Sequence, residues 1–402
     1  MALFLFGIIE MVINMIKKVP EHKITKDFLK GYKRHQVTEK VLFLNNGVLE
    51  EKKDAFTEEW EQNKLEMVSM YLKKHAKKGC VYAAYSGKHV IGFASIESHL
   101  FGEYVNMSYL HTDERYRGEG IGRELIYFIG LEAIKLGGKK LYISAHPAVD
   151  TQKFYFSVGC ELAENVNMKL HSIEPLDIQL ELKLDYSILL KLVKLYLAKE
   201  KKSATYFGRI ASRFYQYLPI DQDAFLDVIK SFLSDGYIGT YSVATLWLKR
   251  RKSVLVPELI DYYDDLLHTV VKGWGAVDQI CYRALNPVIT SGDLHSYLIK
   301  WSDSDNKDVR RASLVSMIRS SGKLTLDYDY ELMINLVDKL KNDEDYHVKK
   351  AVGWVLKCAY PTYNKKIELY LRENVKNLDR MIYRYALEHV EEPLRSELIN
   401  LR

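Results

Sequence analysis

The strongest constraint on the fold of this 402-residue chain is a change in the spacing of its apolar residues near Leu184. Before this point, short apolar runs separated by turn residues predict strands, as at 81–85, 89–96 and 105–112. After it, apolar residues recur at three- and four-residue intervals, which is typical of amphipathic helices. We therefore predict an α/β domain with a mixed, mostly antiparallel sheet over residues 1–184, and an all-α domain over residues 185–402.

Length and cysteine usage agree with two cytoplasmic domains. A chain of 402 residues is long enough for two or three domains. The four cysteines, Cys80, Cys160, Cys281 and Cys358, lie far apart and form no C-x-x-C pair. This spacing argues against a disulfide framework and a cysteine-ligated metal, so we expect no metal site and a reducing, cytoplasmic location.

The charges and the amino-terminal end identify no partner by themselves. Residues 1–184 contain 25 Lys and Arg against 24 Asp and Glu, and residues 185–402 contain 33 against 29. The small excess in the second half is compatible with nucleic acid binding but does not require it. Residues 1–16 are apolar but precede their lysines and are short for a membrane span, so we interpret them as an extension before a later start. An amphipathic anchor and a membrane segment are the less favoured alternatives.

A glycine-rich loop, Arg117-Gly118-Glu119-Gly120-Ile121-Gly122-Arg123, lies between a predicted strand and a predicted helix that ends at Gly137-Gly138. Glycines leave backbone N–H groups uncovered, and the positive end of the helix dipole and two arginines add to their effect. These features favour a cradle for a pyrophosphate. The loop is neither a Walker loop nor a full dinucleotide fingerprint, and a simple tight turn is the alternative.

A second motif makes this interpretation specific. The pattern Arg117-x-x-Gly120-x-Gly122 and the later segment Phe154-Tyr155-x-x-x-Gly159-Cys160 together resemble the GNAT N-acetyltransferases, over about residues 15–184. Cys160 stands where an aromatic residue is more usual. The resemblance implies acetyl coenzyme A as cofactor and Tyr155 as general acid, with a packing aromatic as the alternative. It also implies that the cofactor is held by Leu110, Thr112, Arg117, Gly118, Glu119, Gly120, Ile121, Gly122 and Arg123.

The general base and the amine acceptor are less defined by the sequence. Glu97 and Glu103 are candidate bases, and a solvated turn residue is the alternative for each. The segment 45–60, interpreted as a loop, is acidic and in the implied fold borders the acceptor pocket. We therefore favour a cationic small-molecule or peptide amine, although a solvated helix face would look the same.

A weak repeat organises the second half. The segments Val309-Arg310-Arg311-Ala312, Val348-Lys349-Lys350-Ala351 and Tyr383-Arg384-Tyr385-Ala386 share an apolar-basic-alanine core, with alanines 39 and 35 residues apart. Paired helices at this period predict a HEAT-like solenoid, whose second helices line the concave face. Asp305, Asp345 and Asp379 are expected to cap the helices that follow them.

This half resembles the DNA alkylation repair family of HEAT-like glycosylases, from about residue 187 to the end. The matching segments are Trp274-x-x-x-Asp278, Trp301-x-x-Ser304-x-Asn306 and Lys350-Ala351-x-Gly353-Trp354. The resemblance implies that Asp278 stabilises a cationic sugar, that Trp274 and Trp354 pack against it, and that Arg311 and Lys350 contact DNA. Core tryptophans and a helix-capping aspartate are the structural alternatives.

The two halves together predict an acetyl-coenzyme-A-dependent N-acetyltransferase with a helical domain that binds duplex DNA or excises alkylated purines. One alternative is a DNA glycosylase with an accessory acetyltransferase domain. Another is an acetyltransferase whose helical domain is a protein- or nucleic-acid-binding scaffold. Convergence of Trp274, Asp278 and Trp354 on one open basic cleft would favour repair, and their separate burial would favour the scaffold.

Overall fold

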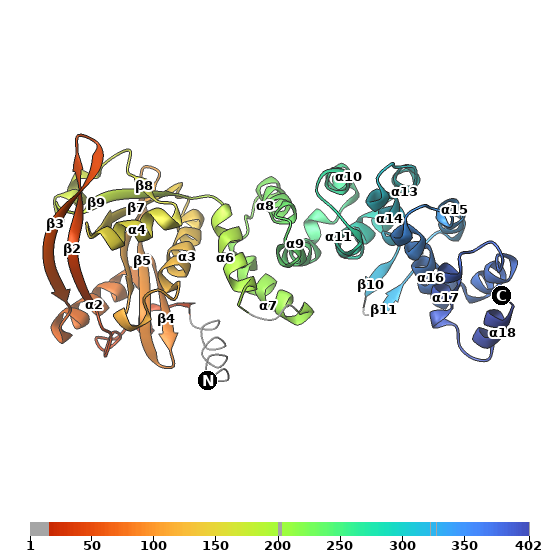
Figure 1. Cartoon of the computed structure of the whole chain (residues 1–402), viewed down its shortest axis with the longest axis horizontal. Helices are drawn as coiled ribbons and strands as arrows, with labels where there is room; N and C mark the ends of the chain where they lie inside the picture. The colour runs from red at the N-terminus through yellow and green to blue at the C-terminus, as the bar shows by residue number, and fades with distance from the viewer. Residues whose placement is uncertain (1–15, 200–202, 322, 327, 402) are drawn as a thin grey trace. The chain divides into compact units, whose positions relative to one another are not determined.

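The computed structural model describes residues 16–199, 203–321, 323–326 and 328–401, and divides into two compact units, 1–201 and 202–402 (Figure 1). The predicted boundary at 184 lies before this division, because helix α6 (Ser187–Leu197) packs on the first unit. The predicted amino-terminal extension lies, apart from Ile16, outside the described residues.

The first unit is built on a seven-stranded sheet with the order β1-β4-β5-β6-β7-β9-β8. Its neighbouring strands are antiparallel except β6 and β7, which confirms the predicted mixed, mostly antiparallel sheet. The strands are β1 (Lys17–Lys18), β4 (Cys80–Ser86), β5 (His89–Phe101), β6 (Tyr104–Thr112), β7 (Lys140–Ala145), β8 (Glu161–Leu162) and β9 (Ile178–Lys183). The helices are α2 (Gln62–Lys78), α3 (Ile121–Lys135), α4 (Val149–Val158), α5 (Met168–His171) and α6.

Helices α2 and α3 cover opposite faces of the sheet. Alternate residues of a strand point to opposite faces. Val81 and Ala83 of β4 belong to the core cluster that α2 closes, whereas the ring of Tyr82 stacks on Phe128 of α3 with centroids 5.0 Å apart. Because both faces of β4 are covered, its first five residues are all buried, and the strand reads as a continuous apolar run.

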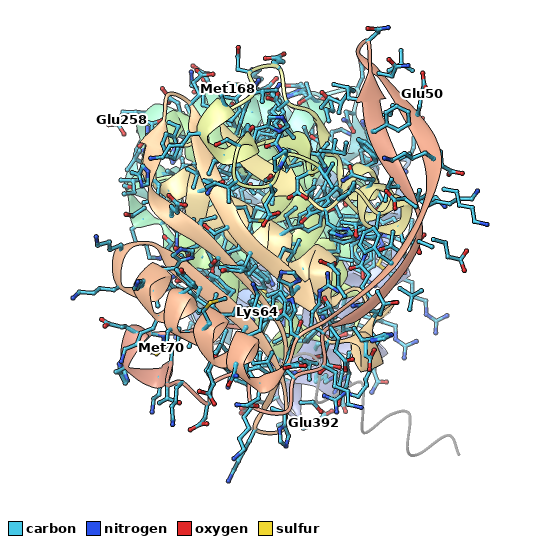
Figure 2. The ribbon with its side chains drawn as sticks, turned by 90° about the vertical axis from the view of Figure 1, so that its left-hand side faces the viewer. Glu50, Lys64, Met70, Met168, Glu258 and Glu392 are labelled. Atoms are coloured by element: carbon cyan, nitrogen blue, oxygen red, sulfur yellow. The ribbon has the colours of Figure 1, made fainter. Side chains whose placement is uncertain are left out.

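A hairpin of β2 (His35–Asn45) and β3 (Val48–Glu59) forms a separate two-stranded sheet, and Figure 2 shows Glu50 near its outer end. The interpretation of 45–60 as a loop was therefore wrong. Nearly every residue of β3 is exposed, so the strand lacks the alternation of apolar and polar residues that reveals a half-buried strand. The hairpin is attached to the start of α4 through a bridge between Val41 and Ala148.

The second unit is helical, as predicted. Its helices are α7 (Ala204–Phe214), α8 (Gln222–Ser234), α9 (Ile238–Arg250), α10 (Ile260–Thr269), α11 (Trp274–Ile280), α12 (Asn286–Ser291), α13 (His295–Ser302), α14 (Lys307–Val315), α15 (Tyr330–Leu340), α16 (Tyr346–Glu373), α17 (Arg380–Ala386) and α18 (Leu394–Asn400). Helices α9, α11, α14, α16 and α17 pack in succession, as in a solenoid whose repeats contact their neighbours. A short hairpin of β10 (Arg319–Ser321) and β11 (Lys323–Thr325) was not predicted.

The capping residues agree with the predicted repeat in two of three cases. Asp345 and Asp379 cap α16 and α17, accepting hydrogen bonds from backbone N–H groups of the first turn. The cap of α14 is Asn306 and not Asp305, because the amide oxygen of Asn306 accepts the N–H of Asp308. Trp247 and Trp301 are fully buried and serve the core. In the part of the chain that the structure describes, no helix has the length and apolarity needed to span a membrane.

The packing of α6 predicts that a fragment ending at residue 184 is less stable than one ending at 201. Helix α6 buries Ile188, Leu189 and Leu192, among others, and an added Cβ on Gly130 of α3 would lie 3.3 Å from Ile188 Cδ1. Exposing α3 costs about 1.5–3 kcal/mol for each large apolar side chain. We expect the shorter fragment to melt at least about 5 °C lower in a thermal scan. Equal melting temperatures would show that α6 contributes nothing to the first unit.

Candidate active site

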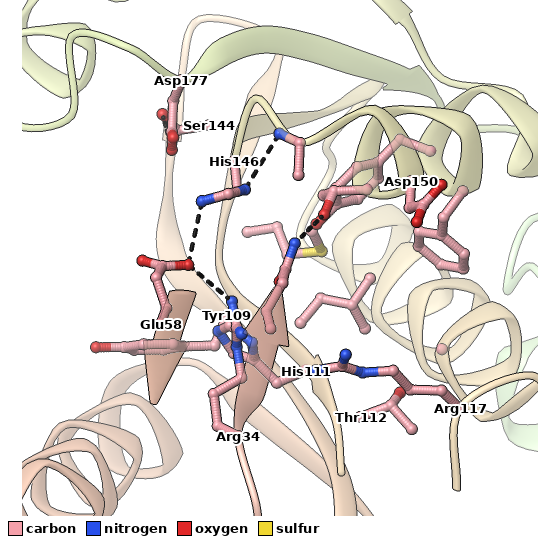
Figure 3. Close-up of a pocket in the computed structure, with 18 of the residues that line it drawn as sticks. Arg34, Glu58, Tyr109, His111, Thr112, Arg117, Ser144, His146, Asp150 and Asp177 are labelled. Atoms are coloured by element: carbon pink, nitrogen blue, oxygen red, sulfur yellow. Dashed lines mark hydrogen bonds and ion pairs between the residues drawn. The ribbon is translucent and has the colours of Figure 1, made fainter. Parts of the chain in front are cut away.

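A large groove opens where β6 and β7 separate. The two strands pair in parallel only from Tyr104–Lys140 to Met107–Ile143, although β6 continues to Thr112. Beyond that point the edge of β6 that faces β7 has no pairing partner among the described strands. The resulting β6–β7 groove has a volume of about 1590 Å³ and is lined by the end of β6, the start of α3, helix α4 and the β2–β3 hairpin (Figure 3).

The glycine loop enters this groove at the amino-terminus of α3. Asp113 holds the start of the loop, since its carboxylate accepts the N–H of Arg115 and pairs with the Arg115 guanidinium. Gly118 and Gly120 have φ values of +84° and +81°, which L side chains rarely adopt, and Gly120 caps α3. Nothing lies within 4 Å of a Cβ added to either glycine, so the loop is open on its outer side.

The loop has the donors that a pyrophosphate requires. Among hydrogen bonds between described residues, none engages the backbone N–H of Gly118, Glu119 or Gly120. Helix α3 has 15 residues, and the partial positive charge at its amino-terminus reinforces these donors. Arg117, Gly118, Gly120, Ile121, Gly122 and Arg123 line the groove, as do Leu110 and Thr112, whereas Glu119 belongs to the loop but not to the lining. The residues present therefore fit a pyrophosphate-containing cofactor.

Gly122 has a different role from the other two glycines. A Cβ at this position would lie 3.2 Å from Cζ of Phe154, the first residue of the second motif. The lack of a side chain at Gly122 therefore lets α3 and α4 approach each other closely. This contact joins the two motifs that were recognised separately in the sequence.

Tyr155 lies on α4 and lines the same groove. The side chain is only 7% exposed, and no hydrogen bond to its hydroxyl is found among the described residues. Burial raises the pKa of Tyr155, with smaller contributions from Cys160 and Asp177. A tyrosine in this state keeps its proton at neutral pH, which a proton donor requires.

The two carboxylates suggested as general bases lie in different settings. Glu97 lines the groove, but its Oε1 accepts hydrogen bonds from Asn106 Nδ2 at 2.8 Å and Ser108 Oγ at 3.3 Å. Glu103 is exposed, pairs with Lys139 at 2.6 Å and is not part of the lining. Glu103 is therefore not a base for this groove.

Sequence reasoning missed two clusters of polar side chains in the groove. Glu58 Oε2 lies 3.4 Å from the guanidinium of Arg34 and 3.1 Å from Nε2 of His146 (Figure 3). Asp177 accepts a hydrogen bond from Ser144 Oγ at 3.2 Å. These residues come from four separate segments and form no sequence motif, so only the tertiary structure could bring them together.

His111, near the end of β6, is neutral. Burial lowers its pKa to about 3, and the positive charges of Arg34 and Arg117 act in the same direction. Its ring packs edge-on against Trp60 with centroids 4.7 Å apart. His111 therefore shapes the wall of the groove and carries no charge at neutral pH.

In the second unit, Asp278 and Arg311 form a buried ion pair. Arg311 Nε and Nη2 donate to the two carboxylate oxygens of Asp278 at 2.8 and 2.9 Å, and Nη1 donates to the carbonyl of His347. Burial raises the pKa of Asp278, although Arg311 opposes this effect. The prediction that Arg311 grips a phosphate is wrong for this structure, because the residue is 3% exposed and its donors are engaged.

Each motif tryptophan contacts Arg311 or its partner His347. The guanidinium carbon of Arg311 is 5.8 Å from the ring centroid of Trp354. Trp274 is 53% exposed and stacks on His347 with an interplanar angle of 16°. Trp354 and Asp278 therefore meet at Arg311, and Trp274 contacts His347. None of these residues is in the lining of the basic groove described next.

Lys350 belongs to a basic groove on the second unit. It is exposed, and its ammonium lies about 6 Å from the rings of Tyr346 and Tyr385. The groove has a volume of about 910 Å³ and is also lined by Lys357, Asp379, Arg380, Met381, Arg384, Tyr385, Glu388 and Arg395. Together with Lys350, the lining has five basic and two acidic side chains, so this surface attracts anions.

Two family models match the chain. Residues 45–159 match the acetyltransferase (GNAT) family, and residues 204–390 match the DNA alkylation repair enzyme family. The first match includes the glycine loop and Tyr155, and it supports the predicted acetyl coenzyme A as cofactor. No curated protein matches the chain.

Solved structures similar to the chain include three acetyltransferases. Nourseothricin acetyltransferase is 13% identical with a TM-score of 0.34, and a putative streptothricin acetyltransferase from Bacillus anthracis, in complex with acetyl coenzyme A, is 17% identical with a TM-score of 0.33. IAA acetyltransferase from Bacillus cereus is 16% identical with a TM-score of 0.27. Each comparison covers 42% of this chain and 98% of the other. The chain therefore joins a domain that matches the acetyltransferase (GNAT) family to a domain that matches the DNA alkylation repair enzyme family.

Proposed function

We propose that the first unit is an N-acetyltransferase that takes its acetyl group from acetyl coenzyme A, which supplies it as an activated thioester. The observation that carries this proposal is the open glycine loop at the amino-terminus of α3, in the same groove as the hydroxyl of Tyr155, which has no hydrogen-bond partner among the described residues. Backbone N–H groups of residues 117–122 hold the pyrophosphate, with Arg117 and Arg123 beside them. The free edge of β6 at Leu110 and Thr112 offers backbone groups to the extended arm of the cofactor.

Tyr155 acts as the general acid in this proposal. Its hydroxyl keeps its proton because burial disfavours the phenolate, and it donates this proton to the sulfur that leaves. The acceptor is an amine, which enters from the side of the groove formed by the hairpin and the segment before β9. The cytoplasmic location predicted from the cysteines is part of the same proposal.

A second function is proposed for the helical unit, which we infer binds duplex DNA. The exposed Trp274, stacked on His347, and the basic groove around Lys350 carry this inference. An exposed aromatic face can pack on a deoxyribose or a base, and lysine and arginine side chains attract phosphates. A protein-binding scaffold is the competing function.

If the helical unit excises alkylated purines, Asp278 would act as a fixed negative charge. Since both carboxylate oxygens accept hydrogen bonds from Arg311, Asp278 offers a fixed negative charge more readily than a free proton acceptor. Such a charge can stabilise a cationic sugar in the transition state. Trp354 lies over the guanidinium of the same pair and forms part of the same cluster.

The glycine loop is tested by Gly120→Glu. A side chain and a negative charge in the cradle should remove the rise in melting temperature that acetyl coenzyme A produces in the native protein by binding only the folded state. Gly87→Glu is the matched control, since Gly87 also has a positive φ of +59° and open space, but lies in the turn between β4 and β5. The control should keep the full shift, and an unchanged shift in Gly120→Glu would remove the loop from the cofactor site.

Tyr155→Phe tests the general acid. The variant keeps the ring and loses the hydroxyl, so we expect kcat to fall roughly 10²- to 10⁴-fold while acetyl coenzyme A binding stays nearly unchanged. Release of coenzyme A thiol and calorimetric binding are the two measurements. A kcat within threefold of the native value would make Tyr155 a packing residue.

DNA binding is tested by Lys350→Ala combined with Arg384→Ala. If the basic groove contacts phosphates, affinity for a duplex should fall at least about tenfold and depend less steeply on salt. Lys230→Ala is the control, because Lys230 pairs with Asp265 on the second unit outside this groove. Equal affinities for all three proteins would favour the scaffold.

An assay of base release distinguishes DNA binding from excision. Native protein that releases 3-methyladenine or 7-methylguanine from methylated DNA would be a glycosylase, and Asp278→Asn should stop this release. Because the substitution also leaves Arg311 buried beside a neutral group, we expect it to lower the unfolding free energy by about 3–5 kcal/mol. Urea denaturation of the variant distinguishes lost chemistry from lost folding.

A further inference from the structure

The end of the β6–β7 groove away from the glycine loop is acidic. Figure 3 shows Asp177 and Ser144 on the opposite side of the groove from Arg117 and Thr112. Three carboxylates line this end, those of Glu58, Glu174 and Asp177, and Arg34 pairs with the first of them. This inference rests on the acetyltransferase function proposed above, because it concerns the acceptor of the same groove.

Asp177 is held in position by a chain of hydrogen bonds. Tyr142 donates its hydroxyl proton to Oε1 of Gln179 at 2.8 Å, which leaves the Gln179 amide nitrogen to donate to Ser144 Oγ and to the backbone carbonyl of Asp177, both at 3.0 Å. Since Ser144 Oγ accepts this bond, its own proton is directed to Asp177 Oδ2 at 3.2 Å. The other carboxylate oxygen of Asp177, Oδ1, has no partner among the described hydrogen bonds.

Glu58 is held by different partners. The backbone N–H of Ala148 donates to Nδ1 of His146, so the neutral ring carries its proton on Nε2 and points it at Glu58 Oε2. Arg34 approaches the same oxygen. Burial lowers the pKa of His146, in keeping with a neutral ring.

The surroundings of Asp177 suit a proton acceptor. Burial raises its pKa to about 6, Glu174 and Glu58 act in the same direction, and the bond from Ser144 opposes them. The polar groups that act on it are Ser144, Glu174 and Glu58, and Asp177 in turn acts on Tyr155 of α4. A carboxylate tuned toward neutrality can take a proton more effectively than an ordinary one.

A second observation in the same groove points to a ligand. Tyr155 is 7% exposed, its hydroxyl has no partner among the described hydrogen bonds, and it lines the cavity that the carboxylates line. The side chain is buried but lines the cavity, so its hydroxyl is available to donate to a molecule bound in the groove. The acidic end and the proton donor therefore belong to one binding site.

We propose that Asp177 is the general base for an acceptor amine, and that the acceptor carries a second positive charge that Glu58 and Glu174 bind. Once Asp177 has taken the proton of the amine it is neutral, so two charged carboxylates, Glu58 and Glu174, remain at this end of the groove. Arg34 balances the charge of Glu58. A second cationic group on the acceptor would balance the other. The substrate class is thus a molecule with at least two amino or guanidino groups.

Asp177 and Tyr155 together account for every proton that the reaction moves. Asp177 takes one proton from the ammonium group, and the free amine forms the new C–N bond as the C–S bond breaks. Tyr155 donates its proton to the sulfur, and the second proton on nitrogen restores the tyrosine hydroxyl. Asp177 then returns its proton to solvent.

The test compares 1,5-diaminopentane with pentylamine, which has the same chain and one charge fewer. With the full chain and saturating acetyl coenzyme A, we expect kcat/KM for the diamine to exceed that for pentylamine at least about tenfold. Glu174→Gln should reduce this preference mainly through KM, because Arg34 already balances Glu58. Asp177→Asn should lower kcat roughly 10²-fold, abolish the loss of kcat/KM below about pH 6, and leave acetyl coenzyme A binding intact. Glu103→Gln is the control, since Glu103 lies outside the groove and should change none of these values.

Several results would overturn the inference. Equal kcat/KM values for the two amines would refute the second positive charge on the acceptor. If Asp177→Asn keeps kcat within threefold of the native value and still loses kcat/KM below about pH 6, Asp177 is not the general base. If the native protein binds acetyl coenzyme A but neither binds nor acetylates the diamine in calorimetry and thiol release, the acceptor class is wrong while the acetyltransferase function stands. Failure of the native protein to bind acetyl coenzyme A would instead refute the proposed function itself.

Discussion

The separation of β6 from β7 is the feature on which the active-site groove depends. Strand β6 stays paired with β5 as far as Thr112, and β7 stays paired with β9 as far as Ala145, so each half of the sheet continues without the other. The chain leaves β6 into the glycine loop and α3, and leaves β7 toward α4. Because both connections start at the same gap, the loop and Tyr155 meet there, and the contact between Gly122 and Phe154 keeps them together.

The two sides of the groove carry opposite charge. The loop side has backbone N–H groups, a helix amino-terminus and two arginines, all of which suit an anion. The opposite side has three carboxylates, and hydrogen bonds fix two of them in defined positions. A groove with this polarity can orient an anionic cofactor and a cationic acceptor toward each other, so that electrostatics contributes to positioning as well as to binding.

The helical unit shows how tertiary context changes the meaning of a motif residue. Asp278 and Arg311 each looked like a group available to DNA, one for the sugar and one for a phosphate. In the structure they satisfy one another, because two buried charges are tolerated only when each meets the other's hydrogen-bonding needs. What remains for a ligand is the exposed ring of Trp274 and the basic side chains around Lys350.

The sequence alone determined the parts whose signal is local. The strands at 81–85, 89–96 and 105–112, the helix after Gly122, and the caps Asp345 and Asp379 all follow from short-range periodicity, backbone freedom and hydrogen bonding. The hairpin strand β3 was missed because exposure on both faces removes the alternation. Only the tertiary structure decided that α6 belongs to the first unit, that Asp177 lies beside Ser144, and that Arg311 is occupied by Asp278. These contacts join residues 33 or more positions apart, and burial and pairing at such distances depend on how elements pack, which no local pattern encodes.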